Sequence, residues 1–210
     1  QYPELTGHLS TAKSPQQMFG AIAKTWLAQQ LGVPPEKLYC VSIMPCLAKK
    51  AECALPTMST VHGPDVDLVL TTRELIRMLR ADRLDPAQLP DEPLDDPMGT
   101  FTGAGTIFGT TGGVMEAALR TAYAQLTGRN PDPDMFRDIR TGPALRQATY
   151  TIAGKTIRCA AVSGLSNTRK LMQALKKKHV HYDFVEVMAC PGGCAGGGGQ
   201  PVPRDDEDFQ

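Results

Sequence analysis

The chain has 210 residues, of which 41% are hydrophobic and 21% charged, and its 22 basic and 22 acidic side chains give no formal net charge. This composition is that of a globular protein with room for one large core or two smaller ones, and it argues against nucleic acid or an anionic membrane as a partner. Apolar runs stay well short of the roughly 20 residues that span a bilayer, so no membrane span is predicted. The start at Gln1 shows no secretory signal; we expect a cytoplasmic location, with a periplasmic one left open.

The first elements predicted are one helix and one strand. Residues 1–13 are expected to be irregular. Ser14-Pro15 predicts a helix start with Ser14 as the N-cap, and the helix continues to about Leu31, where Gly32 ends it. The apolar run 38–44 predicts a buried strand with Met44-Pro45-Cys46 at its carboxyl end.

The middle of the chain predicts a second strand, one loop and two helices. A strand at 66–70 runs into Thr71-Thr72-Arg73-Glu74, a capping-box pattern that opens a helix to about Arg80. Residues 82–100 are rich in proline and acids and predict a surface loop. The glycine- and threonine-rich stretch 103–113 leads into a helix that ends near Gly128. Met18 and Met115 have helical spacing with apolar neighbours, which favours core packing.

The last third predicts a loop at 129–145, a hairpin, a helix and a strand. The hairpin pairs 149–152 with 155–162 around Ala153-Gly154, Asn167 caps a helix to about Lys178, and Phe184–Met188 is the final strand. Alternation of strands and helices predicts the α/β class with mainly parallel sheets, in which ligands bind beyond the carboxyl ends of strands. Residues 204–210 are acidic and are expected to be a frayed tail.

A cysteine-bearing, glycine-rich segment follows the final strand. It reads Met188-Ala189-Cys190-Pro191-Gly192-Gly193-Cys194-Ala195 and continues with four glycines. Cysteine thiolates hold iron–sulfur clusters, and glycines let the backbone approach a bulky ligand. The Cys-x-x-x-Cys spacing differs from the Cys-x-x-Cys pairs of structural zinc sites, and six cysteines are too few for a disulfide scaffold of this size. The segment therefore predicts a cofactor loop that needs further ligands from elsewhere.

A second motif, Met44-Pro45-Cys46-Leu47-Ala48-Lys49-Lys50-Ala51-Glu52, supplies one more thiol. Helical spacing places the Cys46 thiol, the Lys49 ammonium and the Glu52 carboxylate on one side of a turn. A cation beside a thiolate site neutralises its ligands and donates hydrogen bonds to them. The other cysteines, Cys40, Cys53 and Cys159, are expected to have structural roles.

These two motifs closely resemble the second and third signatures of the [FeFe], or iron-only, hydrogenases. Residues 10–17 and 105–120 match other stretches of the same catalytic domain. The resemblance implies a two-lobed α/β large-subunit domain with mainly parallel sheets flanked by helices and an H-cluster in the cleft between the lobes. That cofactor is a [4Fe–4S] cubane joined to a diiron subcluster with CO, cyanide and bridging dithiolate ligands. The implied activity is the reversible reaction 2H⁺ + 2e⁻ ⇌ H₂.

The same resemblance assigns roles to individual residues. It implies that Cys46, Cys190 and Cys194 ligate the cubane and that Cys194 bridges to the diiron centre. It places Lys49 on a cyanide ligand, Ser10 on the proton path and Glu52 as an anchor of its loop. Residues implied to line the diiron pocket are Ser14, Pro15, Gln16, Met44, Phe108 and Met188. The residues implied to be catalytic are Lys49, Ser10, Met44 and Met188.

One departure from the family pattern matters for activity. The first signature, Thr-Ser-Cys-Cys-Pro, is absent from these residues, and in the family it supplies the fourth cubane ligand and a proton-carrying thiol. We therefore expect residues 1–203 to be the C-terminal part of a catalytic domain that binds no complete H-cluster alone. The implied partners are an upstream segment or subunit with the missing motif and accessory iron–sulfur clusters, a ferredoxin-like electron carrier, maturation proteins, H₂ and protons.

Two other functions remain open. One is a hydrogenase-like iron–sulfur assembly protein without diiron chemistry, and the other is a hydrogen-sensing hydrogenase. Lys49, Gln16 and the pair Met44 and Met188 are what a cyanide-bearing diiron site needs, and this favours the catalytic interpretation.

Overall fold

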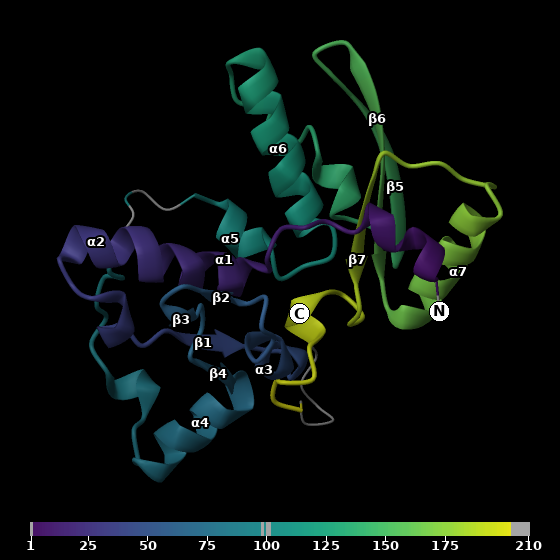
Figure 1. Ribbon diagram of the computed structural model, residues 1–210. Helices are drawn as coiled ribbons and strands as arrows, with labels where there is room; N and C mark the ends of the chain where they lie inside the picture. The colour runs from purple at the N-terminus through teal and green to yellow at the C-terminus, as the bar shows by residue number, and fades with distance from the viewer. Residues whose placement is uncertain (1, 98, 100–101, 203–210) are drawn as a thin grey trace. The chain divides into compact units, whose positions relative to one another are not determined.

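The computed structural model describes residues 2–97, 99 and 102–202 (Figure 1). The chain forms two compact units, which we describe separately. Unit 1 comprises Gln1–Phe101 with Gly198–Gln210, and unit 2 comprises Thr102–Gly197. The tail predicted at 204–210 lies outside the described residues, as do parts of the loop predicted at 82–100.

A long helical run dominates the first third of unit 1. It consists of α1 (Pro15–Ile22), a π-helical segment η2 (Ala23–Leu27) and α2 (Ala28–Leu31). The run ends as predicted at Gly32, whose φ of 62° is left-handed. The expectation of an irregular start is corrected, because the 3₁₀ helix η1 (Pro3–His8) precedes the run.

The strands of unit 1 form two small sheets. β1 (Val41–Met44) pairs in parallel with β4 (Leu68–Thr71), and β2 (Ser59–Thr60) pairs antiparallel with β3 (Gly63–Pro64). The capping box predicted at Thr71 and Glu74 is present and opens α4 (Thr72–Ala81). The remaining helical segments of the unit are η3 (Pro35–Lys37), α3 (Ala48–Cys53) and η4 (Pro86–Gln88).

Two ion pairs attach the helical run, and Lys13 just before it, to the segment that leads into β4. The Lys24 side chain, only 3% exposed, lies 2.7 Å from Asp67, whose second carboxylate oxygen accepts from the Cys40 N–H at 2.7 Å. Lys13 pairs with the buried Asp65 at 2.5 Å. Buried charges are tolerated only when they are paired and hydrogen-bonded, so these contacts fix the helix against the strands.

Unit 2 is built on a three-stranded sheet of order β5-β6-β7. The hairpin predicted around Ala153-Gly154 is present, and its strands are longer than predicted. The strands are β5 (Leu145–Ile152), β6 (Lys155–Ser163) and β7 (Phe184–Met188). The helical segments are α5 (Ala104–Ile107), α6 (Gly113–Thr127), η5 (Arg137–Ile139), α7 (Leu165–Lys176) and η6 (Cys194–Gly196).

Helices cover both faces of this sheet, with α6 and α7 on opposite sides (Figure 1). Met115 of α6 packs with Cys159 and Ala161 of β6, whereas Leu171 of α7 packs with Ala160 and Val162. Side chains alternate between faces along a strand, so β6 contributes to two apolar clusters and is buried on both sides. The α/β class is thereby confirmed.

Three expectations need correction. Antiparallel pairings are as frequent as parallel ones among the described strands, because a tight turn joins β5 to β6. The N-cap of α7 is Gly164, and the Asn167 amide donates to the Ser163 carbonyl instead of capping the helix. Met18 is 41% exposed, whereas Met115 is buried as expected. No helix within the described residues is long and apolar enough to cross a membrane.

Candidate functional site

Four candidate residues of unit 1 meet in one hydrogen-bonded network that includes the helix after Cys46. The Lys49 ammonium lies 2.9 Å from one oxygen of Glu52, three residues further along α3. The other oxygen of Glu52 accepts from the Ser14 hydroxyl at 2.7 Å and from the Gln16 amide at 2.9 Å. The start of α1 and the helix after Cys46, 38 positions apart in sequence, are therefore joined at one carboxylate.

Glu52 stays ionised in this network. Burial raises the pKa of its carboxyl, but hydrogen bonds from Lys49, Ser14 and Gln16 outweigh that effect and hold the pKa below its usual value. Ser14 is the N-cap residue of α1, as predicted, yet its hydroxyl serves Glu52 and makes no capping bond. Because an ammonium carries three donors and Glu52 takes one, Lys49 keeps two N–H groups for another acceptor.

The turn at Cys46 is closed by Gly199, which belongs to the same unit. The Gly199 N–H donates to the Pro45 carbonyl at 3.0 Å, and the Gly199 carbonyl accepts from the Arg73 N–H at 3.1 Å. A side-chain carbon at Gly199 would lie 2.8 Å from the Cys46 nitrogen. Only glycine allows this approach, so the glycine run shapes the backbone around the cysteine.

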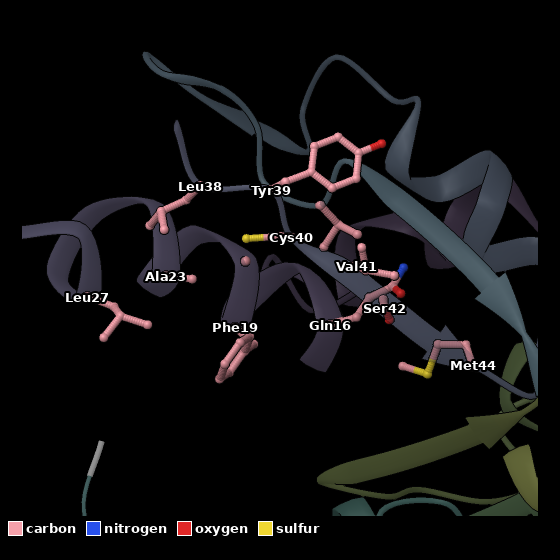
Figure 2. A pocket seen from close by; sticks show the side chains of 12 residues that line it. Gln16, Phe19, Ala23, Leu27, Leu38, Tyr39, Cys40, Val41, Ser42 and Met44 are labelled. Atoms are coloured by element: carbon pink, nitrogen blue, oxygen red, sulfur yellow. The ribbon is translucent and has the colours of Figure 1, made fainter. Parts of the chain in front are cut away.

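The other predicted residues of unit 1 are less closely associated. Met44 and Gln16 both line an apolar cavity of 430 Å³ between α1 and the segment 38–44 (Figure 2). Pro15 is exposed at the first turn of α1. Ser10 is exposed, and its hydroxyl oxygen accepts from the Ala12 N–H at 3.2 Å, outside the Glu52 network.

In unit 2, the turn that carries Cys190 and Cys194 packs on the backbone of residues 109–111. The Thr111 N–H donates to the Gly192 carbonyl at 3.0 Å, and the Ala195 N–H donates to the Gly109 carbonyl at 3.1 Å. Gly193 has φ 106° and ψ −159°, which is a conformation available essentially to glycine alone. Phe108 comes directly before this contact and Met188 directly before the turn, and both are partly exposed.

Glu186 is a site-supporting residue that sequence reasoning missed. Its carboxylate, in β7 and 8% exposed as a residue, accepts from the N–H groups of Gly112 at 2.5 Å and Met115 at 2.8 Å. Burial raises the pKa of Glu186, while these two donors and the nearby Arg146 lower it in part. Glu186, four residues before Cys190, thus holds the start of α6 and with it the turn at 109–113. The sequence signal for Glu186 was a single acidic residue within the apolar run 184–188.

The donor set of the described residues suits a thiolate-bound metal cofactor. Cys46, Cys190 and Cys194 are partly exposed and form no disulfide. Within the described part of each unit, no three His, Cys, Asp or Glu side chains form a single-ion site. Two of these thiols lie in a glycine-rich turn, and the third is followed three residues later by an ammonium group, a set that suits an iron–sulfur cofactor.

Comparison with known proteins identifies the family. The model for "Iron only hydrogenase large subunit, C-terminal domain" matches residues 1–198, and the chain belongs to this family. Membership implies an iron–sulfur cofactor and relates the chain to a family of oxidoreductases.

Individual relatives agree with this assignment. The chain is 50% identical over 206 residues to the NADP-reducing hydrogenase subunit HndD of Solidesulfovibrio fructosivorans, and 47% identical over 201 residues to the periplasmic [Fe] hydrogenase large subunit of Nitratidesulfovibrio vulgaris. These matches cover 98% and 96% of this chain but 35% and 48% of the relatives, so the chain spans half or less of their length. A cytosolic Fe-S cluster assembly factor of Danio rerio, narfl, is 34% identical over 95% of this chain and 50% of its own length.

Solved structures show the same fold. The apo [FeFe]-hydrogenase HydA1 of Chlamydomonas reinhardtii, in a variant form, matches with a TM-score of 0.81 and 36% identity. The match covers 98% of this chain and 59% of that chain. The α/β arrangement of the hydrogenase domain is therefore present in this chain.

Proposed function

We propose that this chain is part of an [FeFe] hydrogenase that catalyses 2H⁺ + 2e⁻ ⇌ H₂ at an H-cluster. In this proposal Cys46 of unit 1 and Cys190 and Cys194 of unit 2 ligate the [4Fe–4S] part, and Cys194 also bridges to the diiron subcluster. The observation that carries the proposal is the network of Lys49, Glu52, Ser14 and Gln16 behind Cys46. A cation held in place beside a thiolate ligand suits an anionic cofactor.

The H-cluster, when bound, supplies the metal centre at which protons and electrons combine, with CO, cyanide and dithiolate ligands on the diiron part. The chain positions and shields that centre. Glu52 holds the Lys49 ammonium, whose remaining N–H groups would be available to donate to a cyanide ligand. Ser14 and Gln16 keep Glu52 fixed. The residues proposed to line the diiron pocket and limit solvent are Pro15, Met44, Phe108 and Met188.

Protons and electrons need further groups in this proposal. The exposed Ser10 hydroxyl accepts from Ala12 and keeps its own O–H free to donate, which suits a place on a proton path. A Cys₄ cubane needs a fourth thiolate. We propose that polypeptide outside these 210 residues supplies it, together with accessory clusters, and that a ferredoxin-like carrier delivers electrons. Assembly of the diiron part requires maturation proteins.

The second candidate function is iron–sulfur assembly without diiron chemistry. It has support because proteins named for cytosolic iron–sulfur assembly match over most of this chain, at 34–36% identity. Three matched hydrogenases are more similar to this chain than those assembly proteins are, at 42–50% identity. Because the overall identity is higher to these hydrogenases, hydrogen chemistry is the preferred function.

Paired cysteine substitutions test the proposal. In the complete, matured protein, Cys46→Ser should lose cubane iron and hydrogen evolution, because a ligand is removed. Cys53→Ser is the matched control: Cys53 is also a partly exposed free cysteine on α3, and its thiol contacts the Lys50 carbonyl at 3.1 Å. Iron content and hydrogen evolution are measured for both. Retention of iron and activity by Cys46→Ser would contradict the assignment, and loss by Cys53→Ser alone would point to different ligands.

A further inference from the structure

Three residues form one row across the sheet of unit 2. Arg146 of β5 is in register with Ala161 of β6, which is in register with Glu186 of β7. Residues in register on neighbouring strands point to the same face of a sheet, and Ala161 packs in the same cluster as Met115 of α6. The two charged side chains therefore stand on the α6 face, on either side of a small alanine.

Both charged side chains bind the same peptide group. The Arg146 guanidinium donates to the Thr111 carbonyl at 2.5 Å, and the Glu186 carboxylate accepts from the Gly112 N–H at 2.5 Å. This C=O and this N–H belong to the one peptide bond that joins residues 111 and 112, and in a trans peptide they point in opposite directions. The peptide therefore bridges the row, with a cation at its oxygen and an anion at its N–H. The small side chain of Ala161 leaves space for this bridge.

The two charged side chains are themselves held by further bonds. The Nε and Nη2 groups of Arg146 donate to the Gly142 carbonyl at 3.3 and 3.0 Å. The second oxygen of Glu186 accepts from the Met115 N–H at 2.8 Å. Hydrogen bonds that involve an ionised group are roughly twice as strong as neutral ones. The grip on the 111–112 peptide is therefore both strong and fixed in direction.

The residue on one side of this peptide also contacts the cysteine turn. The Thr111 N–H donates to the Gly192 carbonyl at 3.0 Å, and Gly192 lies between Cys190 and Cys194. Peptide units are planar and rigid, so Thr111 has only its two backbone dihedrals with which to absorb a tilt of the peptide that follows it. Loss of the grip should therefore disturb the N–H that holds Gly192.

We propose that Arg146 and Glu186 act together as positioning residues, which grip the 111–112 peptide from both ends and thereby set the turn that presents Cys190 and Cys194 before any metal is bound. Capping of α6 alone does not explain the arrangement, because Arg146 binds a carbonyl that precedes the helix. The inference rests on the proposed function only in taking these two cysteines as ligands of the cofactor.

Residue-resolved amide exchange of the complete, metal-free protein tests the grip. The amides of Thr111 and Ala195 donate across the contact between the two turns. Relative to the Val162 amide in the buried strand β6, they should exchange at least about tenfold faster in Arg146→Gln and in Glu186→Gln, because each variant loses a charge-assisted hydrogen bond. Arg146 is only partly buried, so its variant tests the inference even if Glu186→Gln does not fold.

Arg120→Gln is the matched control in the same unit. Arg120 also joins a buried acid, Glu116 at 2.8 Å, to main-chain carbonyls, but these belong to residues 132–133. This variant should leave the two turn amides as they are relative to Val162. Unchanged turn amides in Arg146→Gln would overturn the inference. Equal acceleration of the turn amides and of Val162 would overturn it too, because a general loss of stability has that effect.

A second measurement separates this inference from the proposed function. After reconstitution of the cubane in the complete protein, Arg146→Gln and Glu186→Gln should shift the g-values of the reduced cubane in electron paramagnetic resonance at wild-type iron content, whereas Arg120→Gln should not. Unchanged g-values would overturn the role of the pair toward the cofactor. If the amides respond as expected but no protein, wild type included, binds a cubane, the grip is confirmed and the proposed function fails.

Discussion

Replacing Gly193 by alanine tests how the cysteine turn of unit 2 is held. A side-chain carbon at this position would lie 2.6 Å from the Gly109 carbonyl oxygen, 2.8 Å from the Thr111 nitrogen and 3.0 Å from the Thr110 carbonyl carbon. These neighbours are backbone atoms, so they cannot rotate aside. The backbone conformation costs a non-glycine residue roughly 1–3 kcal/mol, and overpacking adds about 1–3 kcal/mol. We expect a loss of several kcal/mol in the unfolding free energy of unit 2.

The neighbouring glycine provides a matched control. Gly192 also has a positive φ, of 77°, but a side-chain carbon there would have no neighbour within 4 Å. Gly192→Ala should therefore cost only the backbone term, about 1–2 kcal/mol. Urea unfolding followed by near-ultraviolet circular dichroism measures both variants, and anaerobic iron binding reports the state of the turn. Equal destabilisation by the two alanines would refute the packing of this turn on residues 109–111.

Three further predictions concern side chains. Ser14→Ala removes a hydrogen bond to the Glu52 carboxylate, so it should raise the pKa of Glu52 and lower the free energy of unfolding by about 1.5 kcal/mol. Carbon-13 NMR titration of the carboxyl measures the pKa, and an unchanged pKa contradicts the network. Hydrogen bonds from Lys50 and from the Thr71 backbone lower the pKa of Glu74 from 4.5 to about 2. The ionised Glu74 should therefore stabilise the fold above pH 4.5, and this contribution should be lost as the pH falls toward 2. The acid-unfolding curve of Glu74→Gln should lack this dependence. Burial, with a smaller effect of Asp183, raises the pKa of Cys159 to about 11. Iodoacetamide should therefore modify Cys159 last among the cysteines of the native chain. Early modification of Cys159 seen by mass spectrometry would contradict its burial.

Local signals predicted the fold where the responsible contacts are local. Thr71 and Glu74 form a capping box because the two residues lie only three positions apart, and Gly32 ends its helix through its own φ. Asn167 failed as a cap because Gly164, with φ 81°, turns the chain into α7 three residues earlier. Met18 has a helical apolar pattern, but that pattern does not tell which face other elements cover.

The candidate site could be predicted only as a set of residues. The pattern Cys46, Lys49, Glu52 follows from helix spacing, and the resemblance added Ser14 and Gln16. The meeting of Ser14, Gln16 and Lys49 at the Glu52 carboxylate depends on how α1 packs beside α3, which no local pattern encodes. Glu186 was missed for the same reason, because its partners Gly112 and Met115 lie more than 70 positions away.

Infrared spectroscopy of the complete protein after maturation tests the hydrogenase proposal most directly. An H-cluster gives bands from CO and cyanide bound to iron, and we predict these bands in the protein that carries this chain. Lys49→Met removes the proposed donor to a cyanide ligand and should shift the cyanide bands more than the CO bands. A matured protein that holds cubane iron but shows neither CO nor cyanide bands would contradict the proposal and favour the iron–sulfur assembly function.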